Sequence, residues 1–343
     1  MIEGLKHFNY QGSFELESGK VIENPRIGYH TFGTLNEKKD NVVWVCHALT
    51  ANSNVPEWWG KVAGPEGYFN PEKHFIVCAN ILGSLYGTTN PNDTDPATGE
   101  PFYKDFPFFT LRDITRLHLL LKDHLNIDNI YFAIGGSCGG QQVLELAVML
   151  GDSLKNIMAI VASAKETAWS IAIHTTQRMA IEADGTWGDK NEKAAAKGLK
   201  AARGIGLLGY RTFDSYVERQ TDNDDRTDGF KAESYIRYQG DKLEKRFNAY
   251  AYWHLTKALD SHNLGRGRGS VEKALSSIRA KSLIIGIDTD TLIPPSEQKF
   301  ITAHIPESHY ACISSNYGHD GFLIEQDKIV KEIDNFINSH HGI

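Results

Sequence analysis

A six-residue glycine-rich turn, Gly135–Gly140, constrains the fold of this chain more than any other stretch. An apolar, β-prone run at 130–134 precedes it, and apolar residues at helical spacing follow it over 141–150. A strand, a tight turn and a helix form the context in which G-x-S-x-G indicates a nucleophile. Ser137 fits that pattern. Cys138 fits it equally well one residue later, and the spacing alone leaves both candidates open.

The remaining pattern predicts an α/β fold with a mostly parallel, doubly wound sheet, because continuous apolar strands alternate with amphipathic helices. We expect a core formed by residues 1–165 and 280–343, and an inserted helical lid over 166–279. The sequence between residues 12 and 33 favours an antiparallel edge hairpin. Further predicted strands are 41–46, 74–79, 157–162, 281–287 and 310–313; predicted core helices are 111–125 and 324–337; predicted lid helices are 169–183, 190–206, 233–243 and 248–259.

Charge and composition narrow the class of protein. A net charge of -7 argues against nucleic acid as a partner, and no apolar run is long enough to cross a bilayer, so we expect no membrane contact. The start of the chain lacks a signal-peptide pattern, and its four cysteines lack paired or metal-ligand spacing. The expectation is a cytoplasmic protein with free cysteines and no metal site.

A serine nucleophile needs a base, usually a histidine that a carboxylate orients. Of fourteen histidines, His319 follows a late strand in a glycine-flanked loop, which makes it the candidate base. Asp288 and Asp290 both follow the preceding strand. We favour Asp290 as the acid because it lies deeper in the loop before Pro294.

The predicted oxyanion hole combines two backbone N–H groups. One belongs to Cys138, the residue after the serine. The other belongs to the loop that begins at His47, with Leu49 as the candidate donor.

Motifs spread over almost the whole chain, and in matching order, resemble the homoserine O-acetyltransferase family of the α/β-hydrolase superfamily. They are His47-Ala48-Leu49-Thr50, Trp58-Trp59, Gly64-Pro65, Asn80-Ile81-Leu82-Gly83, Gly87-Thr88-Thr89, Asn90-Pro91, Pro96-Ala97-Thr98-Gly99, Asp105-Phe106-Pro107, Ala202-Arg203, Tyr210-Arg211, Tyr238-Gln239-Gly240, Arg246-Phe247 and Gly318-His319-Asp320.

The resemblance implies a function in methionine biosynthesis. Ser137 would take an acetyl group from acetyl-CoA and pass it to L-homoserine in a ping-pong reaction, with no permanently bound cofactor. It also implies a homodimer formed through the lids. The family's substrate-binding residues fall on Arg203, Tyr210 and Asp320, which suits an acceptor carrying a carboxylate and an ammonium group.

One departure concerns the residue after the nucleophile, where the family commonly has methionine and this chain has Cys138. A residue that offers only its backbone N–H tolerates that change, so the resemblance favours Ser137. A succinyl donor, serine as acceptor, and a serine esterase with the same triad remain alternatives. The stretch 265–269, Gly-Arg-Gly-Arg-Gly, is a candidate phosphate-binding loop for CoA, but it follows no buried strand, and we favour its interpretation as a basic linker returning from the lid.

Overall fold

The computed structural model describes residues 3–339. Within them, eight strands form the main sheet in the order β1-β4-β6-β5-β7-β8-β9-β10. The strands from β6 to β10 in that order run parallel, and β4 is antiparallel to both of its neighbours. Their bounds are β1 Lys6–Asn9, β4 Arg26–Phe32, β6 Phe75–Ala79, β5 Val42–Cys46, β7 Ile130–Gly136, β8 Leu154–Ile160, β9 Lys281–Ile287 and β10 Ser308–Ile313.

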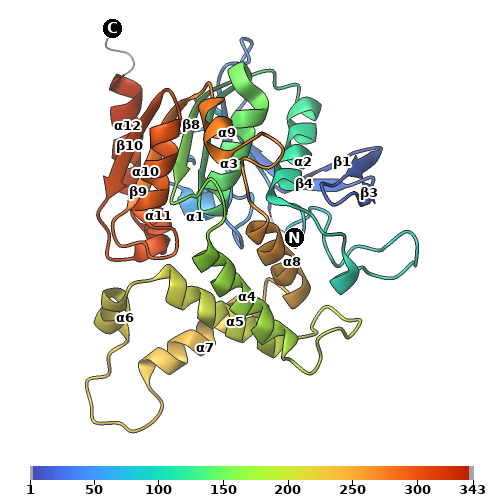
Figure 1. Ribbon diagram of the computed structural model, residues 1–343, viewed down its shortest axis with the longest axis vertical. Coiled ribbons are helices and arrows are strands. Elements are labelled where there is room, and N and C mark those ends of the chain that lie inside the picture. Colours follow the sequence, from blue (N-terminus) through green and yellow to red (C-terminus); the bar gives the residue numbers. More distant parts are fainter. Residues whose placement is uncertain (1–2, 340–343) are drawn as a thin grey trace.

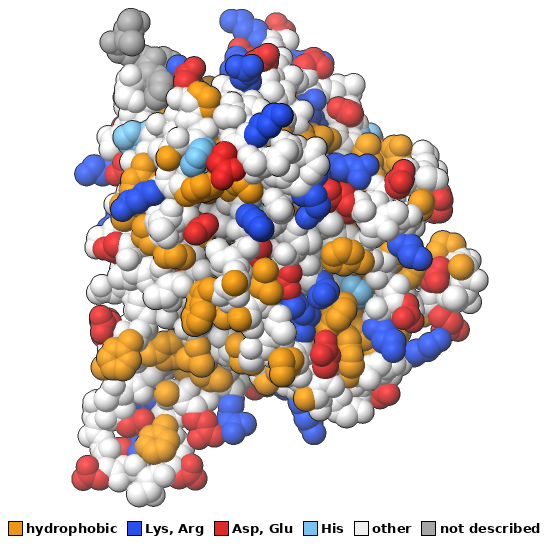
Figure 2. Space-filling view, viewed as in Figure 1, with side chains coloured by type: hydrophobic (Ala, Val, Ile, Leu, Met, Phe, Trp, Pro, Cys, Tyr) orange, Lys and Arg blue, Asp and Glu red, His pale blue; other side chains and the backbone are white. Residues whose placement is uncertain are grey.

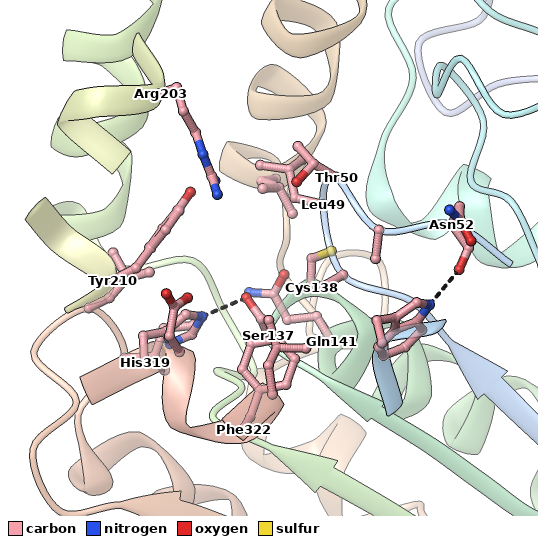
Figure 3. Close-up of a pocket in the computed structure, with 18 of the residues that line it drawn as sticks. Leu49, Thr50, Asn52, Ser137, Cys138, Gln141, Arg203, Tyr210, His319 and Phe322 are labelled. Atoms are coloured by element: carbon pink, nitrogen blue, oxygen red, sulfur yellow. Dashed lines mark hydrogen bonds between the residues drawn. The ribbon is translucent and has the colours of Figure 1, made fainter. Parts of the chain in front are cut away.

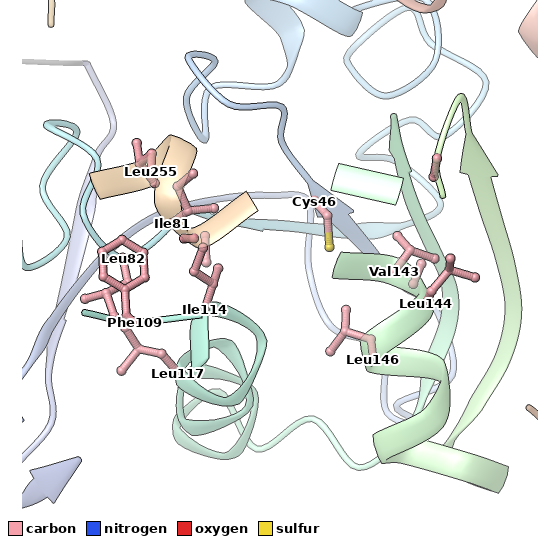
Figure 4. Packing of buried hydrophobic residues seen from close by; sticks show 14 of the residues in the cluster. Cys46, Ile81, Leu82, Phe109, Ile114, Leu117, Val143, Leu144, Leu146 and Leu255 are labelled. Carbon is pink, nitrogen blue, oxygen red and sulfur yellow. The ribbon is translucent and has the colours of Figure 1, made fainter. Parts of the chain in front are cut away.

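The continuous apolar strands arise because both faces of the sheet are covered. In β5, Trp44 and Cys46 pack into one hydrophobic cluster, while Val43 and Val45 pack into the cluster on the other face. Figure 4 shows the first cluster where α2 and α3 meet the sheet. The helices that contribute to it include α2 Leu111–His124, α3 Cys138–Leu150, α9 Val271–Ser276 and α10 Pro295–His304; the cluster on the opposite face includes residues of α1 Pro56–Trp59, α11 Gly321–Ile324 and α12 Gln326–Ser339.

A layer of five helices lies beyond one end of the sheet, at the bottom of Figure 1. The chain leaves the core and returns to it at one place, where Lys165 and Asn263 form an antiparallel β-bridge. We call this layer the lid; its exact domain boundaries stay a prediction. Its helices are α4 Ala168–Glu182, α5 Ala196–Tyr210, α6 Phe213–Gln220, α7 Lys231–Glu244 and α8 Ala249–Asp260.

Two predictions from the sequence were wrong in detail, and several short helices were not predicted. Residues 12–33 do not form a single edge hairpin: β2 (Ser13–Glu15) and β3 (Val21–Glu23) pair separately, while β4 enters the main sheet. The helix predicted over 190–206 spans 196–210 instead. Helices α1, α6, α9, α10 and α11 were not predicted, because short segments give a weak periodic signal.

The stretch 265–269 agrees with its interpretation as a linker. Arg266 pairs with Glu17 at 2.6 Å, and Arg268 pairs with the buried carboxylate of Glu145 at 2.8 Å. Both arginines therefore fasten the returning chain to the core.

Candidate active site

Ser137 stands alone between the end of β7 and the start of α3, in a backbone conformation that side chains rarely adopt (φ 58°, ψ -128°). The flanking glycines permit this turn. A Cβ on Gly135 would lie 2.4 Å from the carbonyl oxygen of Gly139, and a Cβ on Gly139 would lie 2.2 Å from that of Cys46. The spacing read from the sequence therefore reflects strand and helix backbones in direct contact.

His319 connects the serine to a carboxylate. Its Nε2 lies 2.8 Å from Ser137 Oγ, and its Nδ1 lies 2.7 Å from Asp290 Oδ2. The other oxygen of Asp290 accepts from the backbone N–H groups of Leu292 and Ile293, at 2.8 and 3.0 Å. The carboxylate is thus fixed, and the ring can donate from Nδ1 while Nε2 accepts the serine proton.

Asp288, the alternative acid, lies elsewhere. It is exposed, and its Oδ1 accepts from the backbone N–H of Ser315 at 3.0 Å. The structure therefore brings Asp290, and not Asp288, to His319.

The environment raises the pKa of His319 above its ordinary value. Burial of the ring opposes protonation, but the charge of Asp290 and its hydrogen bond outweigh that cost, and the carboxylates of Asp320 and Glu166 add to them. The imidazolium that forms after proton transfer is therefore stabilised in place.

Cys138 is poorly suited to be the nucleophile. Burial, with a contribution from the charge of Glu166, raises the pKa of its thiol to about 12, which disfavours the reactive thiolate. Its sulfur lies 3.7 Å from the carbonyl oxygen of His47 rather than beside His319. Its backbone N–H opens α3, where the positive end of the helix dipole favours negative charge.

The loop that contains Leu49 lies next to Cys138 at the cavity, as Figure 3 shows. His47 holds this loop: its Nδ1 lies 2.8 Å from the carbonyl oxygen of Ala48, and its Nε2 accepts from the N–H of Ile81 at 3.2 Å. Burial lowers the pKa of His47 to about 4, which keeps the ring neutral and suits one donating and one accepting nitrogen.

A cavity of about 750 Å³ opens over Ser137 between core and lid. Arg203 and Tyr210, seven residues apart on α5, reach into it from one helix face, and Figure 3 shows the Arg203 guanidinium and the Tyr210 hydroxyl directed toward each other in the cavity. Arg203 lies over the Tyr210 ring at 5.9 Å, and no carboxylate of residues 3–339 forms an ion pair with it. Its charge is available to an anionic group in the cavity.

Asp320 also lines the cavity, next to His319 in the chain. Its Oδ2 accepts from Arg211 Nε at 2.8 Å, an ion pair that the sequence reasoning did not anticipate. The only available signal was that Arg211 follows Tyr210, which the family resemblance had placed in the substrate site.

A second acidic side chain on the cavity wall was missed. Glu166 is 6% exposed and has no cationic partner among the described residues. Gln141 Nε2 donates to it at 2.9 Å and lies 3.1 Å from Ser163 Oγ. Gln141 occupies the first turn after the nucleophile, and the polar pair it forms with Glu166 gave no recognisable pattern in the sequence.

Comparison with known proteins identifies the family. A family model described as the alpha/beta hydrolase fold matches residues 41–326. The homoserine O-acetyltransferase of Cyclobacterium marinum is 47% identical over 335 residues, which cover 98% of this chain and 95% of that protein. The chain belongs to the homoserine O-acetyltransferase family. The family resemblance seen in the sequence and the α/β-hydrolase fold are both confirmed.

Solved structures agree with this family fold. The homoserine O-acetyltransferase of Staphylococcus aureus has a TM-score of 0.82 and 29% identity, with 97% of this chain and 95% of that chain covered. Esterase E22 superposes with a TM-score of 0.89 at 22% identity, covering 97% and 99% of the two chains, which shows the shared fold alone. This chain and that esterase therefore share one overall architecture.

Two further findings concern the described residues. No helix within 3–339 is both long and apolar enough to cross a membrane. Over the same range, no group of three or more histidine, cysteine or acidic side chains is arranged to hold a metal ion.

Proposed function

We propose that this protein transfers an acetyl group from acetyl-CoA to the hydroxyl of L-homoserine, a step of methionine biosynthesis. The observation that carries the proposal is the chain Ser137–His319–Asp290 under a cavity lined by Arg203, which has no carboxylate partner among the described residues, in a member of the homoserine O-acetyltransferase family.

The first half-reaction forms an acyl-enzyme. Ser137 Oγ attacks the thioester carbonyl while His319 Nε2 takes the hydroxyl proton. The backbone N–H groups of Leu49 and Cys138 stabilise the oxyanion. When the intermediate collapses, the C–S bond breaks and His319 returns the proton to the departing CoA sulfur.

The second half-reaction repeats these roles with the acceptor. His319 takes the proton of the homoserine hydroxyl, whose oxygen attacks the acetyl-serine carbonyl. The ester bond to Ser137 then breaks, and the serine oxygen recovers the proton from His319. Water attacking at the same point would make the protein an esterase, so the lid must favour homoserine over water.

The acceptor is held by the amino-acid groups that it carries. Arg203 binds the carboxylate through its guanidinium fork, and Tyr210 supports that arginine. Asp320 binds the ammonium group, while Arg211 fixes the orientation of the aspartate. Recognition of both charges selects a free amino acid over a simple alcohol.

The active form is a homodimer joined through the lids. Large exposed apolar side chains concentrate there, and in Figure 2 orange side chains gather over the lower part of the molecule, where Figure 1 places the lid. Apolar patches of this kind mark interaction surfaces. Those on the lid are Trp169, Met179, Leu208, Phe213, Val217, Phe230 and Tyr238.

The experiment that tests the function is product analysis with purified protein. Acetyl-CoA plus L-homoserine should yield O-acetylhomoserine, and acetyl-CoA alone should yield one equivalent of CoA and a stable acetyl adduct. Succinyl-CoA as donor and L-serine as acceptor should serve poorly. Hydrolysis of acetyl-CoA at an equal rate with and without homoserine would instead identify an esterase.

The adduct also identifies the nucleophile. Ser137→Ala should abolish it and lower turnover on the order of a million-fold, the effect of removing a triad serine. Cys138→Ala should retain the adduct and most of the activity, because only the backbone of that residue takes part. Peptide mass mapping of an acetyl group on Cys138 would contradict this assignment.

A further inference from the structure

Two cationic side chains line the active-site cavity from its lid side. Lys242 lies near the end of α7, and Arg246 lies in the connection between α7 and α8. Both are exposed, whereas Ser137 is half-buried and His319 is 3% exposed. The two cations therefore occupy the solvent side of the cavity, its mouth.

Neither cation is neutralised within the protein. No carboxylate of the described residues forms an ion pair with Lys242 or Arg246. Several other basic side chains of the lid and its linker do have an acidic partner: Lys200 with Asp241, Arg211 with Asp320, Arg237 with Glu233, Arg266 with Glu17, and Arg268 with Glu145.

Arg246 is also held in one orientation. Its Nη1 donates to the carbonyl oxygen of Thr50 and to Tyr86 Oη, and its Nη2 lies 3.4 Å from Thr50 Oγ1. These partners are uncharged, so they position the guanidinium without cancelling its charge. The acidic residues at this cavity, Glu3 and Glu57 among them, come from the core side.

We propose that Lys242 and Arg246 bind the phosphate groups of the acyl-CoA donor at the mouth of the cavity, on its lid side. The inference rests on the proposed function. CoA carries its thioester at one end of a long pantetheine arm and its phosphates at the other. When the acetyl group reaches Ser137 on the floor, the phosphates lie outward, and a protein of net charge -7 needs local cations to hold them.

The test compares two donors that differ only in the phosphate-bearing part, acetyl-CoA and acetyl-pantetheine. Lys242→Ala should lower kcat/KM for acetyl-CoA about tenfold, the value of one charge-assisted contact, and leave acetyl-pantetheine within about twofold. Lys242→Glu should lower it further. Raising the salt concentration should weaken acetyl-CoA use by the wild type more than by either variant.

For Arg246 variants, too, the informative quantity is kcat/KM for acetyl-CoA relative to acetyl-pantetheine, because Arg246 also contacts Thr50, next to Leu49. Arg246→Ala should slow both donors and slow acetyl-CoA more. Lys231→Ala is the matched control: it removes an exposed charge from the other end of α7, outside the cavity, and should alter neither donor.

The outcomes separate the two levels of the proposal. Equal losses with both donors in the Lys242 variants would overturn the phosphate assignment while leaving the transferase intact. A wild type that forms no acyl-enzyme with either donor would overturn the proposed function, and this inference with it.

Discussion

Asp288 and Asp290 are two residues apart in one loop, yet only one of them is aimed at the base. Asp290 is 3% exposed and touches His319, so Asp290→Asn should lower turnover by about 10⁴-fold, as the loss of the triad carboxylate does elsewhere. Asp288→Asn is the control and should cost far less, because that carboxylate caps the backbone of Ser315. The reverse order of losses would move the acid by two residues.

The same pair predicts a pH dependence. His319 must be neutral to accept a proton, so kcat/KM for acetyl-CoA should rise as pH increases through its pKa, which Asp290 holds above the ordinary value of about 6.5. Asp290→Asn removes that charge and should move the titration of His319 to lower pH. An NMR titration of the histidine in both proteins measures the shift; an unchanged pKa would exclude Asp290 as its cause.

Helix α5 carries the predicted acceptor contacts. Arg203→Ala should slow transfer to homoserine about 10- to 100-fold, the value of a charged hydrogen-bonded contact, because the substrate carboxylate loses its partner. The first-turnover release of CoA should survive, since that step precedes acceptor binding. Lys197→Ala, an exposed change on the same helix, is the control. Loss of the CoA burst in Arg203→Ala would mean that the arginine serves the donor.

This helix also shows how far sequence patterns reach. The buried strands were predictable because a continuous apolar run such as Val42–Cys46 is stable only in the interior, covered on both faces of the sheet. The turn around Ser137 was predictable because only glycine avoids a backbone clash where the strand and the helix meet. The bounds of α5 could not be predicted, because its many glycine and alanine residues weaken the helical periodicity. The helix spans 196–210 and not the expected 190–206. Glu166 became recognisable only in the structure, where the fold brings it to Gln141 at the cavity wall, because nothing in its own stretch of sequence indicates a cavity.

In the molecule as a whole, the apolar surface of the lid predicts association. Phe213 is 79% exposed and Leu208 is 64% exposed, so the Phe213→Glu, Leu208→Glu double variant should turn a dimer into monomers. Light scattering coupled to size-exclusion chromatography measures the mass. Phe108→Glu, at an exposed core position, should leave the dimer unchanged. A monomeric wild type would contradict the prediction.

The contact between Arg246 and the Thr50 carbonyl joins the lid to the loop that carries Leu49. Because this contact forms only when the lid packs on the core, the position of the lid and the position of the Leu49 loop are coupled. Such a coupling free energy acts equally in both directions. If Leu49 is an oxyanion donor, as proposed, negative charge that develops against its N–H during turnover should tighten the seating of the lid. A molecule that wedges the lid away should, by the same amount, weaken the oxyanion hole, and would act as an inhibitor without approaching Ser137.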